Sequence, residues 1–125
     1  MSRIEFSEKR LTIDSKYIVD FPYPIEEAFE TKKAVVVLLN PDSYPMRGLH
    51  KNLLGYDRQG KKLWEAELPR YSRFDVWARK SPASEASDIY WAVKQREPLI
   101  ASSFSSYNCK INEATGEIES AEFYK

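Results

Sequence analysis

Few residues in this sequence are of the types that carry out catalytic or metal chemistry, and their spacing is not that of a site. His50 is the only histidine and Cys109 the only cysteine. A zinc site usually draws three or four ligands at recognisable spacing, and a nucleophilic triad would have to use His50. His50 lies beside Gly48 in a polar segment, so we expect it to be solvated and without a catalytic role. Cys109 alternates with Tyr107 and Ile111 in a strand-like run, which predicts a buried apolar role.

Carboxylates and glycines give no stronger catalytic signal. Glu26 and Glu27 are adjacent, and with nineteen acidic residues only the fold could bring a pair together for glycoside hydrolysis. The four glycines form neither common phosphate-binding loop. Asp57 and Gly60 alone lack the run of oxygen ligands found in a calcium-binding loop. We therefore predict no metal, no cofactor and no enzymatic activity, and rank a hydrolase built from scattered carboxylates third among the functions considered.

One segment combines cations with aromatic side chains, as binding surfaces often do. Between Arg70 and Lys80, four cations are interleaved with three aromatics in the least regular part of the chain. Single-stranded nucleic acid could stack on such a mixture, but the net charge of zero disfavours that partner. The structural alternative is an edge strand over 74–78 whose aromatics face the core. Because Arg, Tyr and Trp are enriched in interface hot spots, the predicted partner-binding residues are Arg70, Tyr71, Arg73, Trp77 and Arg79.

Length and composition place these residues in one small domain, which we assign to residues 1–125. Eight Tyr, six Phe and three Trp favour half-buried strand surfaces. A single cysteine suits a reducing compartment, and the first residues contain no apolar stretch of signal-peptide length. The longest apolar run, 34–39, is too short to cross a bilayer. We expect a cytoplasmic protein that does not enter a membrane.

The apolar pattern predicts a mainly β fold with two early hairpins and a buried strand. One hairpin is expected over 10–21 around Asp14 and Ser15. The other spans 52–65 around residues 57–60, where Asp and Gly are typical of a tight turn. Residues 33–39 form a continuous β-branched run, which is typical of a strand covered on both faces.

The rest of the chain predicts a C-terminal meander and two ambiguous segments. The meander uses 99–104, 107–111 and 117–123, separated by short polar turns. Residues 25–30 fit either one helical turn or a short edge strand, and residues 85–96 fit either strand or helix.

The two clearest turns share a motif. The first has Asp57, Gly60 and Trp64 in the pattern D-x-x-G-x-x-x-W. The second has Asn112 for the acid, one extra residue before Gly116, and no tryptophan after it. The motif resembles the outer hairpin of a propeller blade in pyrroloquinoline-quinone enzymes. The arrangement over roughly residues 25–125 is similar to that of small uncharacterised bacterial β-proteins, which pair one such hairpin with a C-terminal meander.

Length limits what this resemblance implies. A closed propeller needs at least about four blades of roughly 40 residues each, and 125 residues can hold three at most. A central quinone-binding channel is therefore not expected. We predict an open, twisted antiparallel sheet or a small two-sheet sandwich, partial-propeller-like, with at most one or two short helices.

These observations favour a non-enzymatic protein-binding module. The lack of a catalytic set, the small size and the resemblance to bacterial proteins suggest a toxin-neutralising immunity protein whose partner is another protein. The alternative is a β module that binds a small ligand. Protein binding predicts an exposed aromatic and charged patch, whereas ligand binding predicts an apolar cavity with a few converging polar groups.

Overall fold

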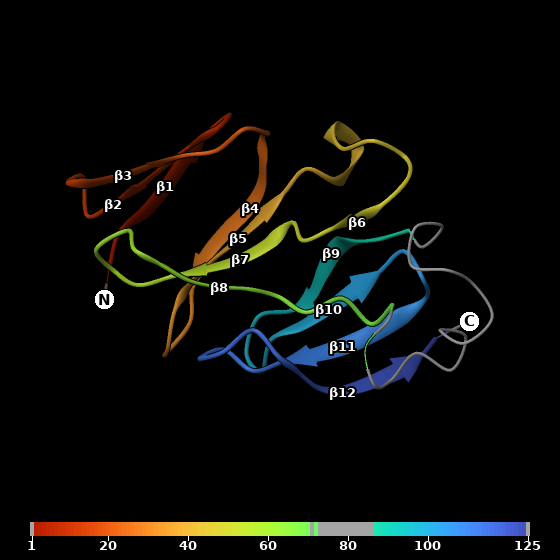
Figure 1. Cartoon of the computed structure of the whole chain (residues 1–125). Helices are drawn as coiled ribbons and strands as arrows, with labels where there is room; N and C mark the ends of the chain where they lie inside the picture. The colour runs from red at the N-terminus through yellow and green to blue at the C-terminus, as the bar shows by residue number, and fades with distance from the viewer. Residues whose placement is uncertain (1, 71, 73–86, 125) are drawn as a thin grey trace.

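The computed structural model describes residues 2–70, 72 and 87–124, whose strands fall into three sheets (Figure 1). The strands are β1 (Ile4–Ser7), β2 (Arg10–Ile13), β3 (Tyr17–Asp20), β4 (Ile25–Glu30), β5 (Val35–Leu39), β6 (Leu49–His50), β7 (Leu53–Tyr56), β8 (Lys62–Glu65), β9 (Asp88–Gln95), β10 (Ile100–Ser103), β11 (Tyr107–Ile111) and β12 (Ile118–Phe123). The N-terminal sheet has the order β1-β2-β3, the central sheet β4-β5-β7-β8 and the C-terminal sheet β12-β11-β10-β9-β6. Among these strands only β6 and β9 pair in parallel.

Local turn chemistry explains both predicted hairpins. Asp14 and Ser15 have φ values of 56° and 55°, which match the right-handed twist of the strands they join. In the second hairpin, Asp57 Oδ1 accepts hydrogen bonds from the backbone of Gln59 at 2.8 Å and Lys61 at 2.9 Å. Gly60 closes the turn with a φ of +84°, a value that a residue with a Cβ adopts at a cost. Both predicted hairpins are confirmed.

The central sheet is covered on both faces, and β5 shows why its sequence is apolar throughout. Every residue of β5 is buried. Val35, Val37 and Leu39 belong to the core shared with the N-terminal sheet. Val36 and Leu38 belong to the core shared with the C-terminal sheet. Because neighbouring residues of a strand point to opposite faces, this alternation requires apolar residues at every position. The prediction of a strand covered on both faces is confirmed.

Trp64 fills the space between the central and C-terminal sheets. Gly55 lies opposite Trp64 in the β7–β8 ladder, and a Cβ on Gly55 would collide with the indole ring. On the other side, a Cβ on Gly116 would lie 2.9 Å from Trp64. The indole Nε1 donates to the backbone oxygen of Glu113 at 2.9 Å. The D-x-x-G-x-x-x-W motif and the Asn112 turn are thus parts of one packing unit.

Asn52 connects the same two sheets through hydrogen bonds. Its side chain is completely buried. Nδ2 donates to the backbone oxygens of Leu39 at 3.0 Å and Tyr90 at 2.6 Å, and Oδ1 accepts from the Tyr90 backbone at 2.9 Å. The amide therefore pairs with Tyr90 as a peptide group of a neighbouring strand would, and it holds β9 against the end of β5.

The mainly-β prediction is confirmed, and the structure adds a third sheet to it. The ambiguous segments 25–30 and 85–96 contain the strands β4 and β9. The meander is formed by β10, β11 and β12, as predicted. Strands β1 and β6 were not predicted, and the one helical element in the described residues is a 3₁₀ turn, η1 (Pro41–Ser43). The strand expected over 74–78 lies outside the described residues.

None of the helices in the described part of the chain is long and apolar enough to cross a membrane.

Candidate functional site

A groove of about 730 Å³ lies at one end of the C-terminal sheet. Its walls come from parts of the chain that are distant in sequence, namely residues 41–50, the beginning of β9 with Ser87 before it, Phe104 and Tyr124. No single segment carries the groove. It exists because β6 pairs with β9 and so brings the segment around His50 beside the meander.

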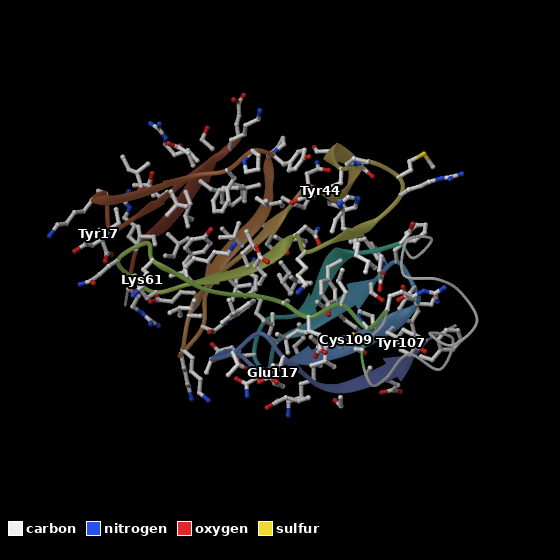
Figure 2. The ribbon with its side chains drawn as sticks, in the orientation of Figure 1. Tyr17, Tyr44, Lys61, Tyr107, Cys109 and Glu117 are labelled. Atoms are coloured by element: carbon white, nitrogen blue, oxygen red, sulfur yellow. The ribbon has the colours of Figure 1, made fainter. Side chains whose placement is uncertain are left out.

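Tyr44 and His50 line one wall of the groove, and Tyr23 packs against Tyr44. The Tyr23 and Tyr44 ring centroids are 4.1 Å apart, and those of Tyr44 and His50 are 5.2 Å apart. His50 Nε2 donates to the backbone oxygen of Arg47 at 2.8 Å, because a carbonyl can only accept. Burial raises the pKa of Tyr44 to about 12. His50 is therefore only partly solvated: the residue is half-buried, and its ring lies against that of Tyr44, which Figure 2 labels.

Trp91 and Tyr124 form the opposite wall. Trp91 is 48% exposed, and its neighbour Tyr90 points to the opposite face of β9, into the core. Ser103 pairs with Tyr90 and Ser102 with Ala92, so Trp91 is the extra residue of a β-bulge. Bulges redirect side chains and are frequent beside functional sites. The indole Nε1 donates to Tyr124 Oη at 3.1 Å, which leaves the faces of the ring for contact with other molecules.

Phe104 is a large apolar side chain presented by a firmly held turn. It is 72% exposed. Its backbone nitrogen donates to Ile89 at 2.9 Å, and Tyr124 Oη donates to the Ser103 backbone oxygen at 3.0 Å. The backbone nitrogen of Ser106 donates to Ser103 at 3.1 Å. The backbone of this turn is therefore well anchored, and it holds the Phe104 ring in an exposed position.

Asp88 is the group that holds this turn, and it is only 2% exposed. Its carboxylate accepts from Ser105 through the backbone nitrogen at 3.0 Å and Oγ at 2.8 Å. It also accepts from the backbone nitrogens of Ile89 at 3.0 Å and Arg70 at 3.3 Å. Burial raises the pKa of this carboxyl, and the four hydrogen bonds offset the effect only in part. With its oxygens so occupied, Asp88 acts as a positioning group.

The structure describes only part of the predicted binding segment. Arg70 is half-buried, and its backbone bond to Asp88 places it beside the groove. The other predicted contact residues, Tyr71, Arg73, Trp77 and Arg79, lie outside the described residues.

Cys109 faces the core, as predicted. It is fully buried on β11 (Figure 2), and its neighbours Tyr107 and Ile111 belong to the same core cluster. Burial raises the pKa of its thiol to about 12. A thiol that stays protonated at neutral pH is a poor nucleophile. Among the residues described, no group of three or more His, Cys, Asp or Glu side chains could hold a metal ion.

Sequence reasoning missed the groove, although one signal was present. Phe104 stands between two pairs of serines, at the end of the strand expected over 99–104 and directly before the expected turn. An isolated phenylalanine at such a polar strand end has few apolar neighbours to bury it. The outward position of Trp91 had no such signal, because alternation separates Tyr90 from Trp91 without telling which of them faces the core.

The fold and the groove together define an all-β domain of three stacked sheets with an exposed aromatic surface at one end. The chain belongs to the family described as Domain of unknown function (DUF7957), whose model matches residues 1–123. No curated protein and no solved structure matches the chain.

Proposed function

We propose that this protein is a non-enzymatic protein-binding module that contacts its partner through the aromatic groove. The observation that supports the proposal is Phe104, a largely exposed aromatic side chain on a turn held by Asp88 and the backbone of β9. Aromatic anchors dominate interface energetics. Anchors that are already held in position lose little conformational entropy on binding.

The hydrogen bonding of the groove favours a partner with apolar side chains. Trp91 Nε1, Tyr124 Oη and His50 Nε2 each donate to another group of the protein, and the carboxylate of Asp88 is occupied by four donors. A polar ligand would have to compete with these bonds. An apolar side chain would gain contact with the ring faces without breaking any of them.

Binding of a small apolar ligand is the second candidate, and the size of the groove favours it. Ligand pockets span roughly 300–1,000 Å³, and about 730 Å³ lies within that range. Such a ligand would raise the melting temperature of the protein by mass action. A screen of small apolar compounds by thermal shift, repeated on Trp91→Ala, tests this candidate.

Selection of displayed peptides tests protein binding directly. We expect the parent protein to select peptides with apolar anchors, and Phe104→Ser to weaken their binding at least about tenfold. Ile18→Ser is the matched control, since Ile18 is an exposed apolar residue of β3 in the N-terminal sheet. Peptides that bind Phe104→Ser as tightly as the parent would contradict the proposal, as would a selection that enriches none.

The narrower proposal is that the partner is a bacterial toxin that this protein neutralises. Small size and the lack of a catalytic set in the sequence support it. Co-purification from the native host followed by a toxicity assay tests it. A partner whose toxicity is relieved by the parent protein but not by Phe104→Ser supports the narrower proposal, whereas a harmless partner contradicts it.

A further inference from the structure

The outer edge of β12 offers hydrogen-bonding groups to another strand. β12 is the last strand of the C-terminal sheet, and Figure 1 shows it on the outside of that sheet. The Tyr124 backbone nitrogen donates to Ser106 at 3.0 Å. Because bonded residues alternate in an antiparallel ladder, Glu122 and Ser120 also bond to β11. The backbone N–H and C=O groups of Ala121 and Phe123 therefore point away from the sheet.

The bonding on the other side of β11 agrees with this assignment. The Ile111 backbone nitrogen donates to Leu99 at 2.9 Å, so Ile111 bonds towards β10. Cys109 and Tyr107 lie two and four residues earlier and bond in the same direction. These residues are paired with β12 at Ala121 and Phe123, the two positions whose backbone groups face outwards.

Apolar side chains at this edge are incompletely covered. Ala121 packs against the core cluster but is only half-buried. Phe123 is 53% exposed, and its ring contacts that of buried Tyr107 at 5.4 Å. A strand added beside β12 would cover Ala121 and Phe123 with its own apolar residues, and so extend the core by one row.

The opposite face of the edge is acidic. Glu122 is exposed there, and none of the described residues forms an ion pair with it. Glu119 accepts a hydrogen bond from Asn112 Nδ2 at 3.2 Å, and its distance to the cation of Lys110 is long, at 3.8 Å. A basic side chain on an added strand would gain a favourable cross-strand pair with Glu122. Two antiparallel copies of β12 would instead bring Glu119 and Glu122 of both chains together, which disfavours self-pairing.

Four other edges of the described sheets, at β8, β3, β6 and β4, are better protected against strand addition. Lysine, proline and short length all blunt sheet edges. β8 begins with Lys62, β3 is followed by Pro22 and β6 has two residues. The first residue of β4 is bonded to the turn after β1, since the Ile25 backbone nitrogen donates to the Glu8 backbone oxygen at 2.6 Å. β12 has six residues and contains neither lysine nor proline.

We propose that the β12 edge binds an extended segment of a partner protein in which apolar and basic residues alternate. The added strand pairs with the outward backbone groups of Ala121 and Phe123 and places its cations beside Glu122. This mode of binding is β-augmentation, in which main-chain hydrogen bonds supply affinity and alternate side chains supply specificity. The site goes beyond the proposed function of the groove and uses a different surface.

The test uses capped six-residue peptides of alternating lysine and valine, or glutamate and valine, with binding measured by fluorescence anisotropy. We expect the full-length protein to bind the lysine peptide about tenfold or more tightly than the glutamate peptide. Glu122→Lys reverses that preference, while Glu26→Lys, at the exposed position of β4, leaves it unchanged. N-methylation of alternate amides of the lysine peptide abolishes binding without altering the protein. Phe104→Ser keeps binding, which separates this site from the groove.

Ala121→Pro provides a second test, because it removes an outward N–H and keeps the ladder to β11. We expect its affinity for the lysine peptide to fall about tenfold or more. Equal binding of both peptides by the parent would overturn the proposal, as would an N-methylated peptide that still binds. A parent protein that sediments as a dimer, and becomes monomeric in Ala121→Pro, would also overturn it, since the occupant would then be a second copy of the chain.

Discussion

Trp64 and Trp91 occupy strands of the same protein, yet one is 5% exposed and the other 48% exposed. Both indoles donate a hydrogen bond within the protein, to Glu113 and Tyr124, so hydrogen bonding does not explain the difference. Space does. Two glycines, Gly55 and Gly116, leave room for Trp64 between two sheets, whereas Trp91 lies at a bulge, on the face of β9 opposite buried Tyr90. The Trp64 region is built for packing, and the Trp91 region keeps its aromatic surface available.

The largest expected effect is at Trp64. Trp64→Ala empties a site that both sheets enclose, and we expect the free energy of unfolding to fall by about 3–5 kcal/mol. Urea denaturation measures this. Leu63→Ala is the control, since Leu63 is exposed on the same strand and should cost far less. A Trp64→Ala protein that melts within about two degrees of the parent would show that the packing argument is wrong.

The next effect is at Asn52, which ties the Trp64 region to the strand that bears Trp91. Asn52→Leu keeps much of the volume but leaves the Tyr90 backbone and the Leu39 oxygen without partners. We expect a loss of roughly 2–3 kcal/mol from the unsatisfied groups. Hydrogen exchange should show faster opening at β9 than at β2. Equal protection of β9 in parent and variant would mean that the two regions are not coupled through this amide.

Asp88 gives the stability of the groove region a pH dependence. Its folded pKa is raised above the ordinary value of 3.8, so the folded protein binds this proton more readily than the unfolded chain. The resulting stability is fully present below that value and is lost as pH rises through the raised pKa. Relative to Asp88→Asn, the parent should therefore lose stability as pH rises above about 4.

The pH dependence caused by Asp88 must be separated from that of carboxyl groups whose pKa is lowered in the folded protein. Hydrogen bonds from Arg58 and Ser2 lower the pKa of Glu30 despite its partial burial, so its contribution is lost as pH falls through the depressed pKa. Subtracting the Asp88→Asn curve from the parent curve removes Glu30, because both proteins contain it. A difference curve that is flat with pH would contradict the assignment.

The smallest effect on stability is expected at Trp91. Trp91→Ala removes a half-exposed ring at the protein surface, and we expect the free energy of unfolding to change by no more than about 0.5–1 kcal/mol. Binding of a groove-selected peptide should fall at least about tenfold in the same variant. A loss of stability as large as that of Trp64→Ala would remove the contrast between the two regions.

Sequence reasoning predicted the features that are set by nearby residues. The β5 strand follows from its unbroken apolar run, and the turn at Asp57 follows from a carboxylate two residues before the amide that it binds. The groove could not be predicted, because its walls meet only after β6 pairs with β9, and β6 has just two residues. Similarly, alternation places Tyr90 and Trp91 on opposite faces of β9, but it does not tell which of the two faces the core.

The enclosure of Trp64 also bears on the order in which the chain can fold. The hairpin of β7 and β8 is local, and its turn can form as soon as those residues are present. The second half of the enclosure, Glu113 and Gly116, lies about fifty positions further along the chain. Contacts of such long sequence separation carry a loop-closure cost and form late. Burial of Trp64 therefore marks the docking of the C-terminal sheet, so the fluorescence of this one residue can separate hairpin formation from completion of the core.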